Sequence, residues 1–401
     1  MSHRHNQACH MRILHIITRL ILGGAQENTV LSCIGQHNRG HTVRLLAGPT
    51  AGPEGSLVEE TRASGVDFEE MPSLVRPVSP WCDLRAFFAL RQAIRCYQPD
   101  VVHTHSSKAG VLGRWAAWSE NQRRCRQRTA AAGSASAFSP IFIVHTIHGL
   151  PFHPYQPALS NLIYRAAEKW AAKRCHRLLS VADAMTAQAV AAGVAPREKF
   201  ETVYSGMRIE PFLREDHDIA AIRRQWGFSS EDVVIGKVAR LFELKGHEFL
   251  LPAFAEIAAA QPRLRLLLVG DGLWRRRIEN LAQKLGIRRR IAFAGLVPHD
   301  RIAETIAAMD IVVHCSLREG LPRVLPQALL AAKPTIAFDV DGASEAVEHG
   351  VTGLLVKPLD IAGLRDAIAW TLANLGEARR MALLGREHCR QRFDWQYMVE
   401  R

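Results

Sequence analysis

Residues 316–327, with the sequence SLREGLPRVLPQ, decide the fold, and they begin just after the apolar run 311–314. The run predicts a buried strand, and the residues after it predict a turn that opens a helix. Glu319 stands beside Gly320 in this turn, where its carboxylate is placed to accept hydrogen bonds from a ligand's hydroxyl groups. The free N–H groups of a helix N-terminus would point at the same spot. The stretch therefore predicts a place to hold a nucleotide sugar.

A second stretch supports the same kind of site. Residues 233–239 predict a buried strand, and an apolar-periodic helix follows through Phe249 and Ile257. Arg240 and Lys245 lie between them, near the carboxyl end of the strand, where open α/β sheets bind ligands. A guanidinium fork and an ammonium group suit a leaving group that gains negative charge. The alternative is an ordinary solvated basic loop.

Both stretches resemble the family 4 retaining glycosyltransferases of the GT-B fold, whose signature is a Glu, seven residues and a second Glu. Glu319 matches the first position, and Gln327 stands at the second. The resemblance implies that Arg240 and Lys245 clasp the diphosphate of the donor, while Glu319 holds the sugar hydroxyls. It also implies that Gln327 meets the ribose, and it adds two neighbours to the donor site, Gly320 and Leu321.

Strand candidates alternate with helical stretches along the whole chain, which is the pattern of a parallel, doubly wound sheet. The first half has strand candidates at residues 13–17, 43–47, 66–70, 101–104, 141–145 and 178–181. The pattern restarts with strand candidates at residues 233–239, 264–269, 291–294, 311–314 and 335–338. Because 401 residues exceed the size at which one core keeps growing, we expect two α/β domains. The resemblance implies the GT-B fold, in which two Rossmann-like domains face each other across a cleft.

The domain boundaries follow from this pattern and from the resemblance. The first domain is expected at residues 11–208 and the second at 209–388. Residues 121–140 are basic at first and then rich in Ala, Ser and Gly, which predicts a mobile surface insertion. The resemblance implies that a helix at 389–401 returns toward the first domain. The polar, His-rich residues 1–10 are left out of the predicted fold.

Two glycines follow the first predicted strand. Gly23 and Gly24 let a backbone approach a bound group closely, and the helix that they open favours anions at its N-terminus. The resemblance implies that this pair lies against the donor, and the alternative is an ordinary tight turn. Because the chain has no G-x-G-x-x-G motif, a dinucleotide-binding dehydrogenase lacks its main support.

Histidines gather at two strand ends of the first domain. His148 follows the strand 141–145 and, by the resemblance, contacts the hydroxyls of the reacting sugar. His105 and Lys108 follow the strand 101–104 and are expected on the acceptor side, whereas His103 is expected to be a hydrogen-bonded strand-end residue. Three histidines also suggest a metal site. The group lacks a carboxylate, however, and no metal is expected.

Asp339 and Asp341 form an Asp-x-Asp pattern, which is the metal-binding signature of a different glycosyltransferase fold. Here the pattern follows a strand of the second domain, where Arg240 and Lys245 already supply cations. We therefore expect the match to be accidental and the activity to need no metal or other cofactor. The resembling family usually has Gly where Asp341 stands.

The composition sets wider bounds on the class of protein. With 48% hydrophobic and 22% charged residues, the chain is typical of a globular protein, and no apolar run approaches the ~18 residues that cross a membrane. Eight cysteines without a C-x-x-C pair indicate reduced, cytoplasmic usage. The net charge of +12 favours anionic partners, but no nucleic-acid-binding motif is present. Peripheral contact with anionic membranes is predicted from basic residues of the first domain, namely Arg85, Arg91, Arg95, Arg123 and Arg124.

The predicted reaction moves a sugar from a nucleoside diphosphate to an acceptor hydroxyl, with retention at the anomeric carbon. The resemblance favours surface polysaccharide or glycolipid assembly at the inner face of the cytoplasmic membrane, with a glycan or lipid-linked acceptor. Two alternatives remain open. One is a nucleotide-sugar epimerase of the same architecture, and the other is a catalytically silent nucleotide-sugar-binding protein, which Gln327 motivates.

Overall fold

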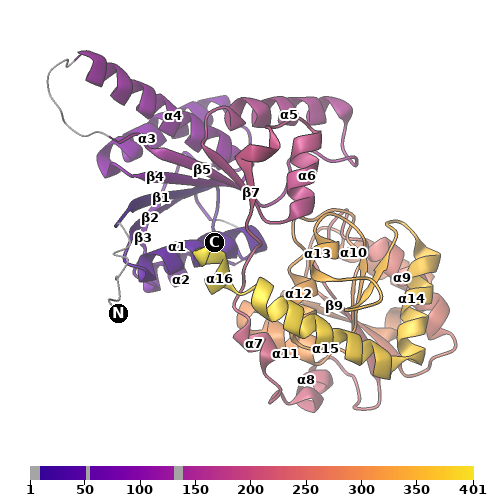
Figure 1. Ribbon diagram of the computed structural model, residues 1–401. Coiled ribbons are helices and arrows are strands. Elements are labelled where there is room, and N and C mark those ends of the chain that lie inside the picture. Colours follow the sequence, from indigo (N-terminus) through magenta and orange to yellow (C-terminus); the bar gives the residue numbers. More distant parts are fainter. Residues whose placement is uncertain (1–9, 51–54, 131–138) are drawn as a thin grey trace. The chain divides into compact units, whose positions relative to one another are not determined.

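The computed structural model describes residues 10–50, 55–130 and 139–401. The chain divides into two compact α/β units, each built on one sheet (Figure 1). The first unit runs to Tyr204 and takes in the last four residues, Met398–Arg401, and the second unit is Ser205–Tyr397. Of residues 1–10, which the sequence analysis left out of the predicted fold, residues 1–9 lie outside the described ranges.

The first unit contains a parallel sheet in the order β3-β2-β1-β4-β5-β6-β7. Its strands are β1 Arg12–Ile17, β2 Thr42–Ala47, β3 Asp67–Glu70, β4 Val101–His105, β5 Phe142–Ile147, β6 Arg177–Ser180 and β7 Phe200–Thr202. Its helices are α1 Gly24–Asn38, α2 Val58–Ala63, α3 Pro80–Tyr97, α4 Ser107–Ala130, α5 Ala158–Ala172, α6 Asp183–Ala191 and the 3-10 turn Arg197–Lys199. Helices α1 and α2 cover one face of the sheet, and α3 and α4 cover the other (Figure 1). Because both faces are covered, the central strands are apolar along most of their length.

The second unit contains a parallel sheet in the order β10-β9-β8-β11-β12-β13. Its strands are β8 Val233–Val238, β9 Leu264–Val269, β10 Ile291–Gly295, β11 Ile311–His314, β12 Thr335–Phe338 and β13 Leu354–Val356. Its helices are α7 Glu210–Leu213, α8 Ile219–Gln225, α9 His247–Ala258, α10 Arg275–Lys284, α11 Ile302–Ala307, α12 Val324–Leu330, α13 Ala343–Ala346, α14 Ile361–Ala373 and α15 Leu375–Arg392, with 3-10 turns at Arg288–Arg290 and His299–Arg301. The core of this unit joins β8, β9, β11 and β12 to the apolar sides of α9 and α14.

The eleven predicted strands all exist, and two others were missed. The predicted ranges 264–269, 311–314 and 335–338 match β9, β11 and β12 at both ends. The missed strands, β7 and β13, are three residues long and lie at the outer edges of their sheets. Strands this short carry too little alternation to separate them from a loop.

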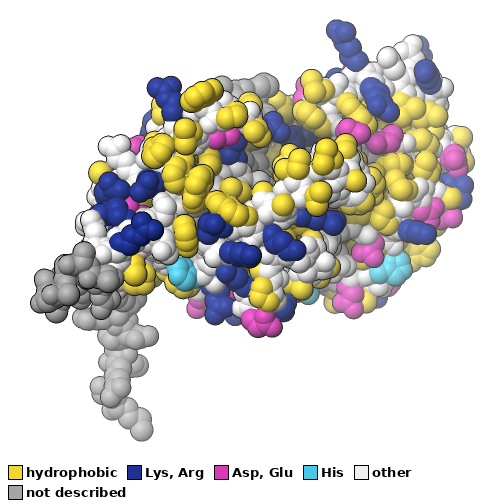
Figure 2. Space-filling view, turned by 90° about the horizontal axis from the view of Figure 1, so that it is seen from above, with side chains coloured by type: hydrophobic (Ala, Val, Ile, Leu, Met, Phe, Trp, Pro, Cys, Tyr) yellow, Lys and Arg dark blue, Asp and Glu magenta, His cyan; other side chains and the backbone are white. Residues whose placement is uncertain are grey.

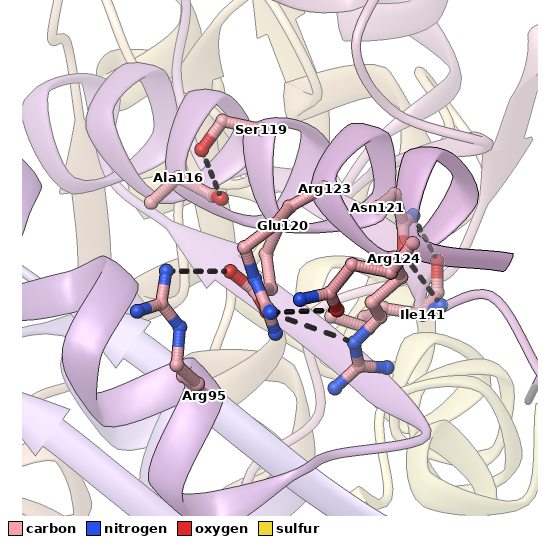
Figure 3. Close-up of polar contacts among 9 residues, drawn as sticks. Arg95, Ala116, Ser119, Glu120, Asn121, Arg123, Arg124 and Ile141 are labelled. Atoms are coloured by element: carbon pink, nitrogen blue, oxygen red, sulfur yellow. Dashed lines mark hydrogen bonds and ion pairs between the residues drawn. The ribbon is translucent and has the colours of Figure 1, made fainter. Parts of the chain in front are cut away.

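The predicted mobile insertion at residues 121–140 is wrong in its first half, because α4 continues to Ala130. Figure 3 shows that the side chain of Asn121, on α4, contacts the backbone of Ile141, the residue before β5. Its Nδ2 donates to the carbonyl of Ile141, and the N–H of Ile141 donates to its Oδ1, both at 2.9 Å. Further along, Arg123 Nη1 donates to Gln127 Oε1 at 2.7 Å. Residues 131–138 of the predicted insertion lie outside the described residues.

The C-terminal segment forms two helices rather than one. α15 ends at Arg392, and α16 spans Trp395–Glu400 after a break at which the N–H of Met207 donates to the carbonyl of Phe393 at 2.9 Å. The last four residues belong to the first unit, where Asn28 Nδ2 lies 3.0 Å from Met398 Sδ.

Candidate functional site

An ion pair joins two loops that follow neighbouring strands of the second unit. Lys245 follows β8 and Glu319 follows β11, and their Nζ and Oε1 atoms lie 2.5 Å apart. His314, the last residue of β11, places its Nε2 3.5 Å from the same oxygen. Both side chains of the pair are mostly buried, with 18% and 19% of their surfaces exposed. The structure thus brings together the lysine and the carboxylate that the sequence predicts.

The charge state of Glu319 follows from this surrounding. Burial by itself raises the pKa of the carboxyl group, but the Lys245 ammonium and the His314 imidazole outweigh burial and hold the pKa well below its usual range. Burial also lowers the pKa of His314, which Glu319 partly offsets. Glu319 is therefore a carboxylate that accepts hydrogen bonds and donates none.

The two loops are fixed to each other at Gly246. A side chain there would place its Cβ 1.8 Å from the carbonyl oxygen of Cys315, and the φ angle of +74° lies in the left-handed region that favours glycine. Cys315 Sγ donates to the carbonyl of Gly246 at 3.0 Å. The N–H of Leu317 donates to the carbonyl of Leu244 at 2.8 Å. Because these contacts involve backbone on both sides, the positions of Lys245 and Glu319 are set by the loops and not only by their own attraction.

Asp341 holds the Glu319 loop from the other side. Its Oδ2 accepts the N–H of Glu319 at 2.6 Å, and the N–H of Gly342 donates to the carbonyl of Gly320 at 3.1 Å. The φ angle of Asp341 is +48°, a conformation that Asp tolerates better than most residues. This explains how a position that favours glycine carries Asp here, with a carboxylate used as a backbone acceptor.

The sequence predicts that a turn carrying Glu319 follows the strand and opens a helix, and the structure has both the turn and the helix. α12 begins at Val324, with Arg323 as its N-cap residue, so Gly320 and Leu321 belong to the loop before it. Pro326 is tolerated as its third residue because the first N–H groups of a helix have no partner within the helix. Gln327 lies on α12 and is half-buried, and its side-chain amide forms no hydrogen bond with any residue in the described part of the chain.

The remaining predicted cation of this unit is placed differently. Arg240 follows the end of β8 and is exposed, with its guanidinium carbon 5.1 Å from the centre of the Phe242 ring. Arg240 also takes part in an interaction beyond this ring contact. The ion pair that joins the two loops is formed by Lys245 and Glu319.

Two buried basic residues near this pair escaped prediction. Lys237 lies within the apolar strand β8, is fully buried, and places its Nζ 3.3 Å from Cys315 Sγ. His247 begins α9, and neither of its ring nitrogens has a hydrogen-bond partner in the described structure. Burial, with help from Lys237, lowers the pKa of His247 to about 2, so the ring is neutral. A single Lys or His inside an apolar run gives no sequence signal of a site.

In the first unit, the glycine pair opens α1. Gly23 is the N-cap residue with extended backbone, and α1 begins at Gly24. A Cβ on Gly23 would come within 2.7 Å of Gln26 Oε1, the far end of a flexible side chain. The backbone conformation of Gly23 therefore does not itself require glycine.

Histidines from three strands form one cluster in this unit. His15 of β1 pairs in register with His103 of β4, and His105 lies two residues further along β4, on the same face. The ring nitrogens of these three residues come within 4.8 Å of one another, and all three side chains are buried. His148, just after β5, contacts His105, with Nε2 3.0 Å from its Nδ1. His15 was missed because one histidine in an apolar strand gives no signal.

The acceptor-side assignment of His105 and Lys108 stays a prediction, and the structure shows what surrounds each side chain. His105 has no exposed surface, and its Nδ1 lies 3.0 Å from Nε2 of His148. Lys108 donates to the carbonyl of Pro77 and, at 2.5 Å, to Asp83 Oδ1, so its charge is neutralised within the unit. His103 is hydrogen-bonded as expected, with Nε2 2.7 Å from Thr146 Oγ1.

Comparison with protein families adds an independent observation. Residues 22–210 match the model described as Glycosyltransferase Family 4, and residues 218–388 match Glycosyl transferases group 1. The two matches adjoin and together cover both units. The chain belongs to the family 4 glycosyltransferases.

Two relatives of this family 4 glycosyltransferase are transferases by name. Over 213 residues, 51% of this chain and 47% of the other, it is 32% identical to D-inositol 3-phosphate glycosyltransferase of Nocardia farcinica. Over 361 residues, 89% of this chain and 87% of the other, it is 24% identical to UDP-Gal:alpha-D-GlcNAc-diphosphoundecaprenol alpha-1,3-galactosyltransferase of Escherichia coli. The chain is therefore a glycosyltransferase, as the sequence predicts.

Solved structures support the fold of this family 4 glycosyltransferase. Anabaena HepE, crystallised with UDP and glucose, superposes with a TM-score of 0.81 over 98% of both chains at 23% identity. This likeness confirms the GT-B fold. Among the described residues, no helix is both long and apolar enough to cross a membrane.

Proposed function

We propose that this enzyme transfers a sugar from a nucleoside diphosphate to an acceptor hydroxyl, with retention at the anomeric carbon. The observation that carries the proposal is the Lys245–Glu319 pair at the carboxyl edge of the second sheet. A bound nucleotide sugar presents a diphosphate and hydroxyl groups, which match an ammonium and a carboxylate. The UDP and glucose in HepE, and the UDP-Gal in the name of the Escherichia coli relative, support a nucleotide-sugar donor.

The proposed chemistry divides between charge and hydrogen bonds. The bond from the anomeric carbon to the diphosphate oxygen breaks, the bond to the acceptor oxygen forms on the same face, and the departing phosphate takes the acceptor's proton. Lys245 uses one N–H for Glu319 and keeps two for the diphosphate, and Arg240 adds a second cation. Glu319, held ionised, accepts hydrogen bonds from the sugar hydroxyls.

The other predicted donor contacts remain part of the proposal. Gln327 is assigned to the ribose, Gly320 and Leu321 to the donor pocket, and Gly23 and Gly24 to the donor's phosphate side. His148 is assigned to a hydroxyl group of the sugar. The exposed side of the half-buried His148 ring and the unpaired amide of Gln327, within the described chain, are consistent with these assignments.

We further propose an acceptor on a lipid or glycan of surface polysaccharide or glycolipid assembly, with peripheral contact to anionic membrane. The basic residues that the sequence suggested are less available than expected, because Arg95, Arg123 and Arg124 converge on the buried Glu120 (Figure 3). The support now comes from apolar side chains that gather beside Lys and Arg on one face (Figure 2). The large exposed apolar residues near the start of α3 and along α5 are Val78, Trp81, Leu84, Phe88, Leu159, Leu162 and Ile163.

Membrane contact is tested by vesicle sedimentation. The protein should bind anionic vesicles at low salt and leave them at high salt, since each basic residue near the surface contributes ~1 kcal/mol. Trp81→Ser, which removes a side chain with 80% of its surface exposed, should weaken binding. Leu273→Ser changes a residue of the second unit that is 86% exposed, and it serves as the matched control. Equal binding to neutral and anionic vesicles would contradict the proposal.

The decisive test of the reaction is release of free nucleoside diphosphate. A thermal-shift screen with UDP, GDP and ADP sugars first identifies the donor, because a ligand stabilises the native state by mass action. Nucleoside diphosphate that forms only when an acceptor is present supports transfer. A catalytically silent binding protein, which Gln327 motivates, would bind the donor and release none. An epimerase would release nucleoside diphosphate, or change the sugar, without an acceptor.

A further inference from the structure

A row of side chains crosses the first unit from α1 to the end of β5. Gln36 on the last turn of α1 places its Oε1 2.7 Å from His15 Nε2. His15 Nδ1 lies 3.0 Å from His105 Nε2, and His105 Nδ1 lies 3.0 Å from His148 Nε2. We call these four residues the histidine row. It uses one nitrogen of His148 and leaves Nδ1 with no partner among the described residues.

Each ring of the row carries a single proton. Burial lowers the pKa of His15 and of His148 to about 4, and it lowers the pKa of His105 well below its usual value. All three imidazoles are therefore neutral near pH 7, with one nitrogen as a donor and the other as an acceptor. A row of neutral rings linked end to end has only two self-consistent proton arrangements, which run in opposite directions.

We propose that Gln36 selects the direction of the histidine row and thereby fixes which nitrogen of His148 meets a ligand. The amide oxygen of Gln36 only accepts, so His15 must donate from Nε2 and accept at Nδ1. His105 then donates from Nε2 to His15 and accepts at Nδ1, where His148 donates from Nε2. His148 is left with an unprotonated Nδ1, which accepts a hydrogen bond from a hydroxyl group.

The strand register explains why this row can form. Parallel pairing places His15 beside His103, and the two-residue period of a strand puts His105 on the same face. That face is the one covered by α1, which carries Gln36. His103 packs against both rings, with centroids 4.8 Å from His15 and 4.3 Å from His105, but its Nε2 bonds Thr146. It fills the space beside the row without joining it.

The consequence for the reaction rests on the proposed function. If His148 contacts the sugar or the acceptor, its unprotonated Nδ1 accepts a hydrogen bond from a hydroxyl group. This hydrogen bond fixes the orientation of the hydroxyl group. In the opposite proton arrangement Nδ1 of His148 would carry a proton and donate a hydrogen bond. The hydroxyl oxygen would then have to accept it, so the O–H bond would point away from His148. Gln36 is thus a positioning residue that acts through two buried rings.

Histidine-selective ¹⁵N NMR tests the proposal without any assay of transfer. In the unaltered protein His15, His105 and His148 should all carry the proton on Nε2, with each signal assigned by a His→Gln variant. Gln36→Lys replaces an acceptor by a donor, and an ammonium near the C-terminus of α1 suits the helix dipole. It should move the proton of His148 from Nε2 to Nδ1. His37→Lys puts the same charge one residue along α1 and should leave the tautomer of His148 unchanged.

Transfer assays add a second, separable readout. Gln36→Lys should lower kcat/KM on the order of tenfold, the value of one neutral hydrogen bond, with binding of the free nucleoside diphosphate unchanged. If the protein transfers no sugar with any donor, the proposed function fails, yet the NMR result still decides the direction of the row. A proton on Nδ1 of His148 in the unaltered protein would overturn the inference, as would an unchanged tautomer in a folded Gln36→Lys variant. Zinc bound stoichiometrically by His15, His103 and His105 would do the same, because a metal would take the lone pairs on which the row depends.

Discussion

The proposed donor site of the second unit and the histidine row of the first each reach the carboxyl ends of parallel strands, yet they are held in opposite ways. At the donor site an ammonium meets a carboxylate at 2.5 Å, and both carry full charge. In the histidine row three neutral rings meet through bonds of 3.0 Å, and no charge is present. Each unit therefore offers the carboxyl ends of parallel strands as a place for functional side chains. In the proposals made above, the first set of side chains responds to charge that develops in a reaction, and the second transmits only the position of a proton.

The largest expected effect comes from removing a cation of the donor site. Lys245→Ala and Arg240→Ala should each lower turnover on the order of 10² or more, because charge develops on the diphosphate mainly in the transition state. Donor binding should fall by much less. Steady-state kinetics with the identified donor and acceptor separates kcat from donor affinity.

A matched lysine controls for the loss of surface charge. Lys284, exposed on α10 of the same unit, is replaced by Ala in parallel and should keep full turnover. Near-normal turnover in both Lys245→Ala and Arg240→Ala would show that the diphosphate is held elsewhere. In that case the contrast between a charged donor site and a neutral histidine row would not hold.

The ion pair should also appear in the pH dependence of stability. The pKa of Glu319 is lower in the folded protein than in the unfolded chain, so the folded state binds fewer protons. The stabilisation is therefore fully present above the unfolded pKa of ~4.3 and is lost as the pH falls below it. Glu319→Gln should lower the free energy of unfolding by about 1–3 kcal/mol at neutral pH, because it leaves Lys245 without its partner.

Urea unfolding at several pH values measures this difference. The gap between Glu319→Gln and the unaltered protein should shrink as the pH falls below ~4.3. Glu377→Gln breaks an exposed pair with Arg380 on α15 and should change stability much less at every pH. A gap that stays constant down to low pH would mean that Glu319 gains nothing from being ionised.

The sequence predicts the residues of the proposed donor site better than those of the histidine row, and the reason is physical. Glu319, Gly320 and Gln327 fall within one short segment, and Lys245 follows a second, so local pattern and resemblance identify them. His15, Gln36 and His148 stand far apart in the chain, and only the pairing of β1, β4 and β5 brings them together. The strand pattern predicts both sheets but not their register, and the row depends on register.

The errors have local causes of the same kind. Basic residues followed by Ala and Ser suggested a loop after residue 120, yet Glu120, a fully buried carboxylate, gathers three arginines and lets α4 continue (Figure 3). The turn that carries Glu319 was predicted, but its contacts were not, because Asp341 and Gly342 hold its backbone from another loop. Such contacts come from residues distant in sequence and leave no periodic signal.

A smaller effect is expected at Gln327, the position at which this chain departs from the family signature. A carboxylate accepts hydrogen bonds from both ribose hydroxyls, whereas an amide offers one acceptor oxygen and one donor nitrogen. Gln327→Glu should therefore strengthen binding of the free nucleoside diphosphate by ~1 kcal/mol, roughly fivefold. Calorimetry on both forms measures it, with Gln283→Glu, exposed on α10, as the control for added negative charge. Unchanged or weaker affinity would remove Gln327 from the ribose.

Removal of metal ions is expected to have no effect on turnover, and this prediction concerns both regions. Chelation by EDTA should leave turnover unchanged, because Arg240 and Lys245 supply the positive charge at the donor and the carboxylate of Asp341 accepts the N–H of Glu319. In the histidine row, both nitrogens of His15 and of His105 already form hydrogen bonds. Activity lost to EDTA and restored by Mg²⁺ or Mn²⁺ would place a cation beside the diphosphate. Activity restored by Zn²⁺ alone would place the cation among the histidines. The histidine row would then carry charge, and it would no longer differ from the donor site in this respect.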